Sequence, residues 1–235
     1  MKLDYYSYTN KGPYKGNQDA IDINRIADDC VIACLADGVG GGLHGEEASK
    51  LATTYFVNQI NITEESVTNI AKDIHWKIIE LAKVNNAEGK MLTTFTGCLV
   101  KENKLYGVHC GDSRLYILRG SGIKQLTEDH TEVNMLLKSG KLSRDDATNY
   151  PRKHILNSAF GTLEDPRIDA FQFELMRNDR VLLTTDGAHG LISKLLLRDL
   201  SHQSSTVEQF GALIVSKIEE IEPTDNYSIV ALEIL

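Results

Sequence analysis

Apolar and polar residues along this chain form two kinds of pattern: short strand-like runs and longer stretches with helical spacing. Near the start, apolar runs at 20–26 and 30–35 flank a polar turn at 27–29, which predicts a strand hairpin. Apolar residues then recur every three or four positions around 48–56 and 67–81. This spacing predicts two helices whose apolar faces pack against a flat surface such as a sheet.

The rest of the chain is predicted as further strands and helices. Short polar turns separate neighbouring strand-like runs, which indicates antiparallel pairing. The predicted strands cover residues 94–100, 104–110, 114–119, 123–126, 168–175, 180–185 and 227–235. The predicted helices cover residues 130–139, 143–150, 195–200 and 207–220.

Strand hairpins and amphipathic helices therefore come in separate blocks along the chain. This order is typical of an α+β fold, in which helices cover antiparallel sheets. Regular alternation of strand and helix is absent, which argues against a doubly wound parallel sheet. We found no linker, repeat or low-complexity segment, so we expect residues 1–235 to form a single domain.

Composition and charge exclude several classes of protein. With 42% hydrophobic and 25% charged residues, the chain has the balance of an ordinary globular protein. Its net charge of −8 disfavours nonspecific nucleic-acid binding, which needs lysine and arginine to displace counterions. No apolar run approaches the roughly 18 residues of a membrane span, and the first residues lack a secretion signal. We therefore expect a cytoplasmic protein with no membrane partner.

The cysteines do not suggest a metal or disulfide site. Cys30, Cys34, Cys98 and Cys110 all lie in strand-like apolar segments, and none forms a Cys-x-x-Cys pair. Small buried apolar side chains in a reducing compartment explain them better than a zinc site does.

Three acidic residues stand at the ends of apolar runs and carry the clearest chemical signal. Asp37 ends the run that starts at Cys30 and precedes a glycine-rich turn, Asp186 follows the run at 181–185, and Asp225 precedes the last strand. A carboxylate on a rigid strand end, beside exposed backbone carbonyls, suits a hard divalent cation. Any one of them alone is better explained as a turn residue. Together, they could converge on one metal centre.

Seven short motifs in order strengthen this interpretation. They resemble those of the metal-dependent serine/threonine protein phosphatases of the PP2C (PPM) family, in the short bacterial form, and they span nearly the whole chain. The motifs are Gly16-Asn17-Gln18-Asp19-Ala20, Asp37-Gly38 with Gly45-Glu46-Glu47-Ala48-Ser49, Thr93-Thr94-Phe95-Thr96, Gly111-Asp112-Ser113-Arg114, Leu126-Thr127-Glu128-Asp129-His130, Thr185-Asp186-Gly187 and Asp225-Asn226. The resemblance implies a four-layer αββα sandwich of two antiparallel sheets, each covered by helices.

The resemblance also implies two Mn²⁺ or Mg²⁺ ions in a cleft at the sheet edge. Asp37 matches the aspartate that bridges both ions, and Gly38 matches a residue whose backbone carbonyl binds one of them. Asp186 and Asp225 match the remaining ligands of the other ion. A glycine at position 38 would permit close approach to the ion.

Two further acidic residues have roles implied only by the resemblance. Asp19 matches a position that holds metal-bound water, and Asp112 matches a ligand of a third, weaker ion.

Two dications about 3.5–4 Å apart can hold a water and lower its pKa enough to supply hydroxide near neutral pH. In-line attack of that hydroxide on phosphorus would make Asp37, Asp186 and Asp225 catalytic through the metal-bound water. No Cys-x5-Arg loop supports a cysteine-dependent mechanism.

The other conspicuous side chains are expected to have structural roles. His44 and His130 are candidates for an acid catalyst, but a loop histidine is usually solvated and one that begins a helix is usually structural. Arg114 is expected to pair with a carboxylate rather than with substrate. We expect strand packing and hydrogen bonding from Thr93, Thr94 and Thr96, and a core or helix-interface position for Trp76.

The chain departs from the family pattern in three places. Tyr14 stands where many members have an arginine that grips the substrate phosphate, so we expect a raised KM, with Lys15 as a substitute point charge. Val39 stands where eukaryotic relatives have a histidine. Ser158 replaces a common arginine in Asn157-Ser158-Ala159-Phe160-Gly161, after a stretch at 130–151 that corresponds to the flap beside the active site.

The function expected from these residues is hydrolysis of phosphoserine and phosphothreonine on proteins. The expected partners are phosphorylated proteins, among them a bacterial Ser/Thr kinase, and the expected state is a monomer. Two alternatives remain open: a pseudophosphatase that acts as a binding module, favoured by Tyr14, and a phosphohydrolase of small molecules. The second is weakened because Gly38 to Gly42 carries no Gly-Lys-Ser/Thr sequence that would cradle a nucleotide.

Overall fold

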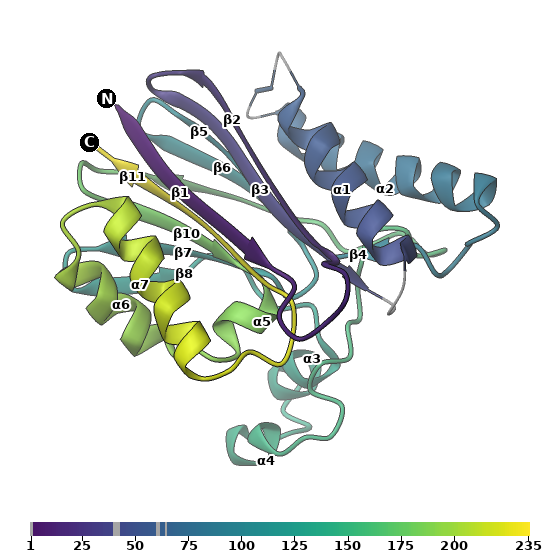
Figure 1. Cartoon of the computed structure of the whole chain (residues 1–235). Coiled ribbons are helices and arrows are strands. Elements are labelled where there is room, and N and C mark those ends of the chain that lie inside the picture. Colours follow the sequence, from purple (N-terminus) through teal and green to yellow (C-terminus); the bar gives the residue numbers. More distant parts are fainter. Residues whose placement is uncertain (1, 40–42, 60–61, 64) are drawn as a thin grey trace.

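Two antiparallel β-sheets lie face to face, and helices cover the outer side of each (Figure 1). The computed structural model describes residues 2–39, 43–59, 62–63 and 65–235. The glycine-rich turn expected after Asp37 extends over residues 40–42 and so lies outside the described residues.

Each sheet is built from strands that are far apart in the sequence. The first sheet has the order β2 (Asp19–Ala27), β3 (Cys30–Val39), β5 (Phe95–Lys101), β6 (Lys104–Cys110) and β9 (Asp169–Glu174), and the short β4 (Leu92–Thr93) pairs with β3. The second sheet has the order β1 (Leu3–Asn10), β11 (Tyr227–Ile234), β10 (Arg180–Thr184), β7 (Arg114–Arg119) and β8 (Gly122–Gln125).

Two pairs of helices form the outer layers. Helices α1 (Leu43–Val57) and α2 (Ser66–Val84) cover the first sheet, and α6 (Lys194–Gln203) and α7 (Val207–Glu220) cover the second (Figure 1). A short α5 (Asp186–His189) follows β10. In the described ranges, no helix combines the length and apolar character needed to cross a membrane.

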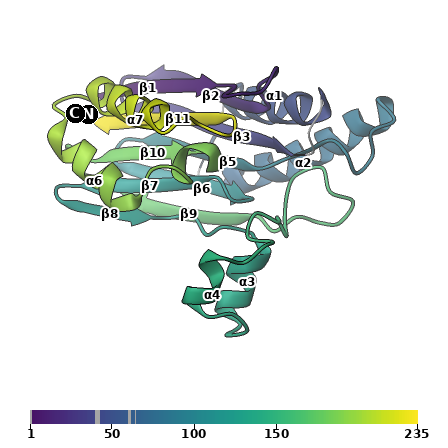
Figure 2. The same cartoon turned by 60° about the horizontal axis from the view of Figure 1, so that its bottom comes forward.

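One segment protrudes from the sandwich. Residues 126–168, called the β8–β9 segment below, carry α3 (Glu132–Lys138) and α4 (Arg144–Thr148), which stand away from the layers (Figure 2). Neither helix has a buried residue. Thr131 and Ser143 cap these helices by accepting a backbone N–H with their side chains.

The alternation of side chains along β3 shows how the layers are held together. Val31, Ala33 and Leu35 point into the core between the sheets. Ile32 and Cys34 point to the opposite face and pack under α1 and α2. Because both faces of β3 are buried, the strand appears in the sequence as a continuous apolar run rather than an alternating one.

The expected αββα sandwich is confirmed, and most predicted elements differ from the observed ones only at their ends. Three elements were not predicted: β1, β4 and α5. Strand β3 is longer than expected and runs through Asp37 to Val39, because Gly38 and Val39 pair with β4.

The prediction that the cysteines are free and buried is confirmed for three of the four, whereas the prediction of a core or helix-interface position for Trp76 is not. The cysteines are free, and three of the four are buried, as expected. The prediction for Trp76 was wrong: its side chain is 54% exposed on α2 and contacts the ring of His75 edge-on at 5.1 Å between centroids.

Candidate active site

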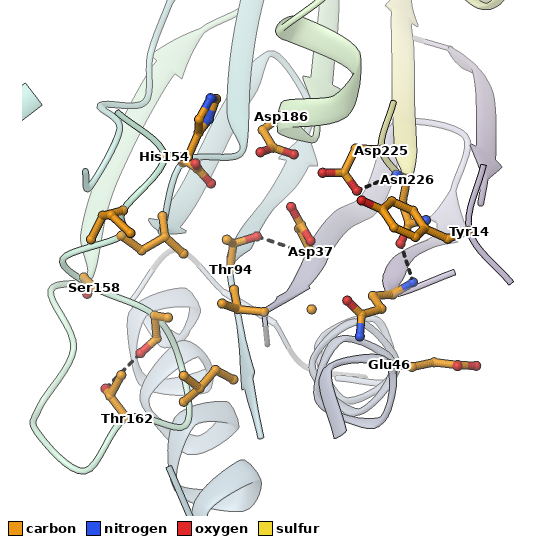
Figure 3. A pocket seen from close by; sticks show the side chains of 18 of the residues that line it. Tyr14, Asp37, Glu46, Thr94, His154, Ser158, Thr162, Asp186, Asp225 and Asn226 are labelled. Carbon is orange, nitrogen blue, oxygen red and sulfur yellow. Dashed lines mark hydrogen bonds between the residues drawn. The ribbon is translucent and has the colours of Figure 1, made fainter. Parts of the chain in front are cut away.

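Five acidic residues come together where the two sheets meet at one end of the sandwich. Asp19 opens β2 and Asp37 lies near the end of β3, while Asp112 follows β6. Asp186 is the first residue of α5, and Asp225 precedes β11. All except Asp19 line a cleft of about 900 Å³. Figure 3 shows Asp37, Asp186 and Asp225 pointing toward a common space.

Asp19 and Asp37 are direct partners in the β2–β3 pair, so both side chains lie on the same face of the sheet. Burial raises the pKa of Asp37 well above its usual value, and repulsion from Asp19 and Asp186 raises it further. Burial also raises the pKa of Asp19 to about 7, although hydrogen bonds from Ser228 and Thr185 oppose the change. Two buried carboxylates in direct opposition repel each other unless a cation or proton neutralises them.

One oxygen of Asp19 has no partner. Its Oδ2 accepts hydrogen bonds from Thr185 Oγ1 at 2.8 Å and Ser228 Oγ at 2.7 Å. Its Oδ1 is buried and accepts none within the described part of the chain. A buried carboxylate oxygen normally has a partner, so this atom indicates a cation or a water beside it.

Asp112 is held in a tight turn between the two sheets. The preceding residue, Gly111, has a φ of +108°, in the region that favours glycine. Burial raises the pKa of Asp112 to about 8, with repulsion from Asp186 and Asp129 in the same direction. The neighbouring Arg114 is bound to Asp129 through two nitrogens, Nη2 to Oδ2 at 2.6 Å and Nε to Oδ1 at 2.9 Å. The predicted role of Arg114 as a partner of a carboxylate is therefore confirmed.

Asp186 and Asp225 are brought together by close contact between α5 and the start of β11. A Cβ atom on Gly187 would meet the Asn226 carbonyl oxygen at 2.0 Å, so only glycine allows this approach. Asn226 also binds the β1–β2 loop: its Oδ1 accepts from Gln18 N at 2.8 Å, and its Nδ2 donates to Lys11 O at 2.7 Å. Burial raises the pKa of Asp225.

Gly38 serves the packing of α1 in this structure. A Cβ on Gly38 would meet Gly45 O at 2.3 Å, so the glycine lets the beginning of α1 approach β3. The backbone of the adjacent Asp37 is held by two threonines: its N–H donates to Thr94 Oγ1 at 2.9 Å, and its carbonyl accepts from Thr93 Oγ1 at 2.9 Å. The buried, hydrogen-bonded positions expected for Thr93, Thr94 and Thr96 are confirmed.

These residues fit divalent cations. The cleft offers several carboxylates, and Asp19 Oδ1 is an unpaired buried acceptor beneath it. Within the described ranges, no three Asp, Glu, His or Cys side chains are arranged to hold one ion by themselves. Backbone carbonyls and waters would have to complete the coordination, and both are common ligands of Mg²⁺ and Mn²⁺.

The lining of the cleft includes one residue that the sequence did not indicate. Tyr14 and Lys15, on the β1–β2 loop, both line the cleft, as does Val39. His154, from the β8–β9 segment, lines it as well (Figure 3). Nothing in the local pattern around His154 indicates that this segment folds back over the carboxylates.

The two histidines considered from the sequence lie elsewhere. His130 is fully buried; its Nε2 lies 3.0 Å from Asp169 Oδ2, and its Nδ1 accepts from Gly111 N. His44 Nδ1 lies 3.6 Å from Glu47 Oε2 on α1, and His44 is not among the described lining residues.

Ser158, which stands where relatives often have an arginine, is buried and forms a structural contact. Its Oγ accepts a hydrogen bond from Arg167 N at 2.8 Å and lies 3.3 Å from Cys110 Sγ. It thereby ties the end of the β8–β9 segment to the first sheet.

Comparisons of sequence and structure relate this chain to known proteins. Residues 14–222 match the family described as Protein phosphatase 2C. Protein phosphatase PhpP of Streptococcus pneumoniae is 32% identical over 194 residues, which cover 78% of each chain. The crystal structure of serine/threonine phosphatase Stp1 from Staphylococcus aureus has a TM-score of 0.90 at 27% identity, covering 100% of this chain and 96% of that one. The catalytic domain of serine threonine protein phosphatase PstP, in complex with two manganese ions, has a TM-score of 0.83 at 25% identity, covering 99% and 98%.

Proposed function

Since the chain belongs to the protein phosphatase 2C family, in its short bacterial form, we propose that it removes phosphate from phosphoserine and phosphothreonine residues of proteins. The observation that carries this proposal is the cleft in which Asp37, Asp112, Asp186 and Asp225 come together above the buried Asp19. Such a density of carboxylates binds cations, and phosphate esters are hydrolysed at cation centres.

The proposed cofactors are two Mn²⁺ or Mg²⁺ ions held by Asp37, Asp186, Asp225 and the Gly38 carbonyl. A solved relative with two manganese ions supports the choice of metal. When bound, the ions would supply an activated water as nucleophile and offset the charge of the transferring phosphoryl group. Asp112 is proposed as a ligand of a third ion.

Asp19 is proposed to orient water at the centre rather than to bind substrate. Thr185 and Ser228 fix its Oδ2, so the free Oδ1 is held in one direction. Asp37 is positioned in a similar way, because Thr93 and Thr94 bind both its carbonyl and its N–H. A site held on strands by such contacts loses little energy to reorganisation when it works.

The substrate would enter between the β1–β2 loop and the β8–β9 segment. Tyr14 and Lys15 are proposed to contact its phosphate, and Asn226 fixes their loop through Lys11 O and Gln18 N. A tyrosine hydroxyl and an ammonium group lack the bidentate fork of arginine, so phosphate binding here should be weaker than in relatives with arginine.

The proposed substrates are proteins phosphorylated by a Ser/Thr kinase, since such a kinase is the chemical source of these esters. We also propose that the chain acts as a monomer. Tyr14 favours one alternative function, a pseudophosphatase that binds phosphoproteins without cleaving them.

The test compares hydrolysis of a phosphothreonine peptide, an aryl phosphate and a nucleotide, each with Mn²⁺, Mg²⁺ or chelator. We expect turnover of the peptide that needs metal and collapses in Asp186→Asn. Preference for the nucleotide would identify a small-molecule phosphohydrolase. Folded protein that binds Mn²⁺ but cleaves none of the three would support the pseudophosphatase and contradict the proposal.

A further inference from the structure

Acidic side chains outnumber basic ones in the described lining of the cleft, so few side chains there can bind a dianionic substrate. Its described lining residues include the acidic Asp37, Glu46, Asp112, Asp186 and Asp225. The basic side chains among those same lining residues are Lys15 and His154. A phosphate ester needs hydrogen-bond donors in addition to the cations, because its non-bridging oxygens carry the charge.

These two basic residues reach the cleft from different segments. Lys15 follows Tyr14 on the loop between β1 and β2, and His154 lies after α4 in the β8–β9 segment. In Figure 3, Tyr14 and His154 stand on opposite sides of Asp186 and Asp225. A phosphoryl group held over these carboxylates by cations would therefore have one donor residue on each side.

The backbone around His154 is well anchored. Ile155 N donates to Arg152 O at 3.1 Å, and Ile155 O accepts from Glu132 N at 2.8 Å. Leu156 forms a bridge with Thr131. The imidazole itself has no hydrogen bond in the described part of the structure and is exposed, so it is free to bind a ligand.

His154 lines the same cleft as Asp186 and Asp225, so its side chain lies within reach of the acidic centre (Figure 3).

We propose that His154 binds the phosphoryl group of the substrate from the β8–β9 side, opposite Tyr14 and Lys15. The proposal rests on the phosphatase function proposed above and assigns to His154 part of the role that the missing arginine has in relatives. One ring N–H donating to a non-bridging oxygen is sufficient, and a neutral imidazole has such a group. Because the β8–β9 segment carries this donor, a change in the position of the segment would directly change the affinity for phosphate.

The test measures KM and kcat for a phosphothreonine peptide with Mn²⁺, and the affinity for inorganic phosphate by calorimetry. In His154→Ala we expect KM and the phosphate dissociation constant each to rise about tenfold, the effect of losing a hydrogen bond to a charged group. His154→Gln, which retains an N–H donor, should recover part of the loss. Lys153→Ala is the matched control: Lys153 is the exposed neighbour outside the described lining and should change neither value.

The outcomes separate this inference from the proposed function. If the native protein cleaves the peptide but His154→Ala has the same KM and phosphate affinity as Lys153→Ala, His154 has no such role and the phosphatase assignment stands. A fall in kcat and melting temperature with unchanged phosphate affinity would show a merely structural role and would also overturn the inference. If the native protein cleaves nothing, the proposed function fails, and phosphate affinity alone decides whether His154 is a phosphate ligand.

Discussion

Asp19 and Asp37 face each other across the β2–β3 pair with both carboxylates buried. Folding raises the pKa of each above its value in the unfolded chain, chiefly through burial. A carboxyl whose pKa is raised in this way destabilises the folded state once the pH exceeds its unfolded value. Without metal, the site should therefore cost stability at neutral pH, and a bound cation should restore it.

We expect Asp37→Asn to raise the stability of the metal-free protein by about 1–2 kcal/mol, which is a rise of several degrees in melting temperature. The reason is removal of one buried negative charge beside Asp19. Melting curves recorded in chelator and then with Mn²⁺ measure both effects, and Mn²⁺ should stabilise the variant less than the native protein.

The matched control is Asp28→Asn, on the exposed turn of the same hairpin, which should leave both values unchanged. A variant of Asp37 that is less stable in chelator, and that gains as much from Mn²⁺ as the native protein does, would show that this pair is not a cation site.

His109 offers a pH-dependent test of a buried neutral side chain. Its Nδ1 lies 2.9 Å from Thr96 Oγ1 and its Nε2 lies 3.0 Å from Glu128 O, which together fit a ring protonated on Nε2 alone. Burial lowers the pKa of His109 to about 4, and the adjacent His130 acts in the same direction. Between about pH 6.5 and 4, the unfolded chain binds a proton that the folded protein does not.

We therefore expect the native protein to lose more stability than His109→Gln as the pH falls through this window, by up to about 3 kcal/mol. Urea unfolding of both proteins at several pH values measures the difference, and other titrating groups cancel because both proteins carry them. The hydrogen bond to Glu128 O and the nearby Asp129 and Asp169 oppose the lowering of the His109 pKa. Parallel stability curves for the two proteins would contradict it.

At the scale of elements, one buried ion pair joins α6, α7 and the second sheet. Arg180 Nη2 lies 2.7 Å from Glu233 Oε1, and Arg180 also donates to the carbonyls of Ser201 and Ser204 at the end of α6. Glu233 Oε2 accepts from Val207 N at the start of α7, at 2.8 Å. The positive charge of Arg180 therefore lies at the C-terminal end of α6, and the negative charge of Glu233 lies at the N-terminal end of α7. Both placements are favourable for the helix dipoles.

Glu233→Gln should reduce the free energy of unfolding by about 3 kcal/mol, because Arg180 would remain buried without its counter-ion. The control is Glu220→Gln, which breaks the exposed pair with Lys217 and should cost no more than about 0.5 kcal/mol. Chemical denaturation of both variants measures the contrast. Equal losses would show that the buried pair adds nothing beyond a surface contact.

The elements that the sequence predicted well are those whose pattern is imposed by burial. Helix α2 repeats apolar residues such as Val67, Ile70 and Ile74 at helical spacing, because one face is buried against the first sheet. Strand β1 was missed because it is an edge strand in which half-buried residues such as Tyr6 alternate with exposed ones such as Ser7, so it lacks a clear apolar face. Strand β4 and helix α5 are two and four residues long, and tertiary contacts specify them rather than local pattern.

At the scale of the whole molecule, the acidic centre exists only because the two sheets pack correctly. Asp19 and Asp37 belong to the first sheet, whereas Asp186 and Asp225 flank strands of the second. The sequence identified these residues as strand ends and motif positions, but their convergence depends on the packing of strands far apart in the chain. His154 was missed for the same reason: only the path of the β8–β9 segment brings it to the cleft.

The most direct measurement is dephosphorylation of a phosphothreonine peptide by the native protein and Asp37→Asn across a Mn²⁺ titration, with Mn²⁺ binding followed in the same samples. We expect turnover of the native protein to rise with Mn²⁺ occupancy and to disappear with chelator. In Asp37→Asn, both tight Mn²⁺ binding and turnover should be lost. Turnover that persists in chelator, or a variant that binds Mn²⁺ and cleaves the peptide as the native protein does, would contradict a metal-dependent phosphatase centre at these carboxylates.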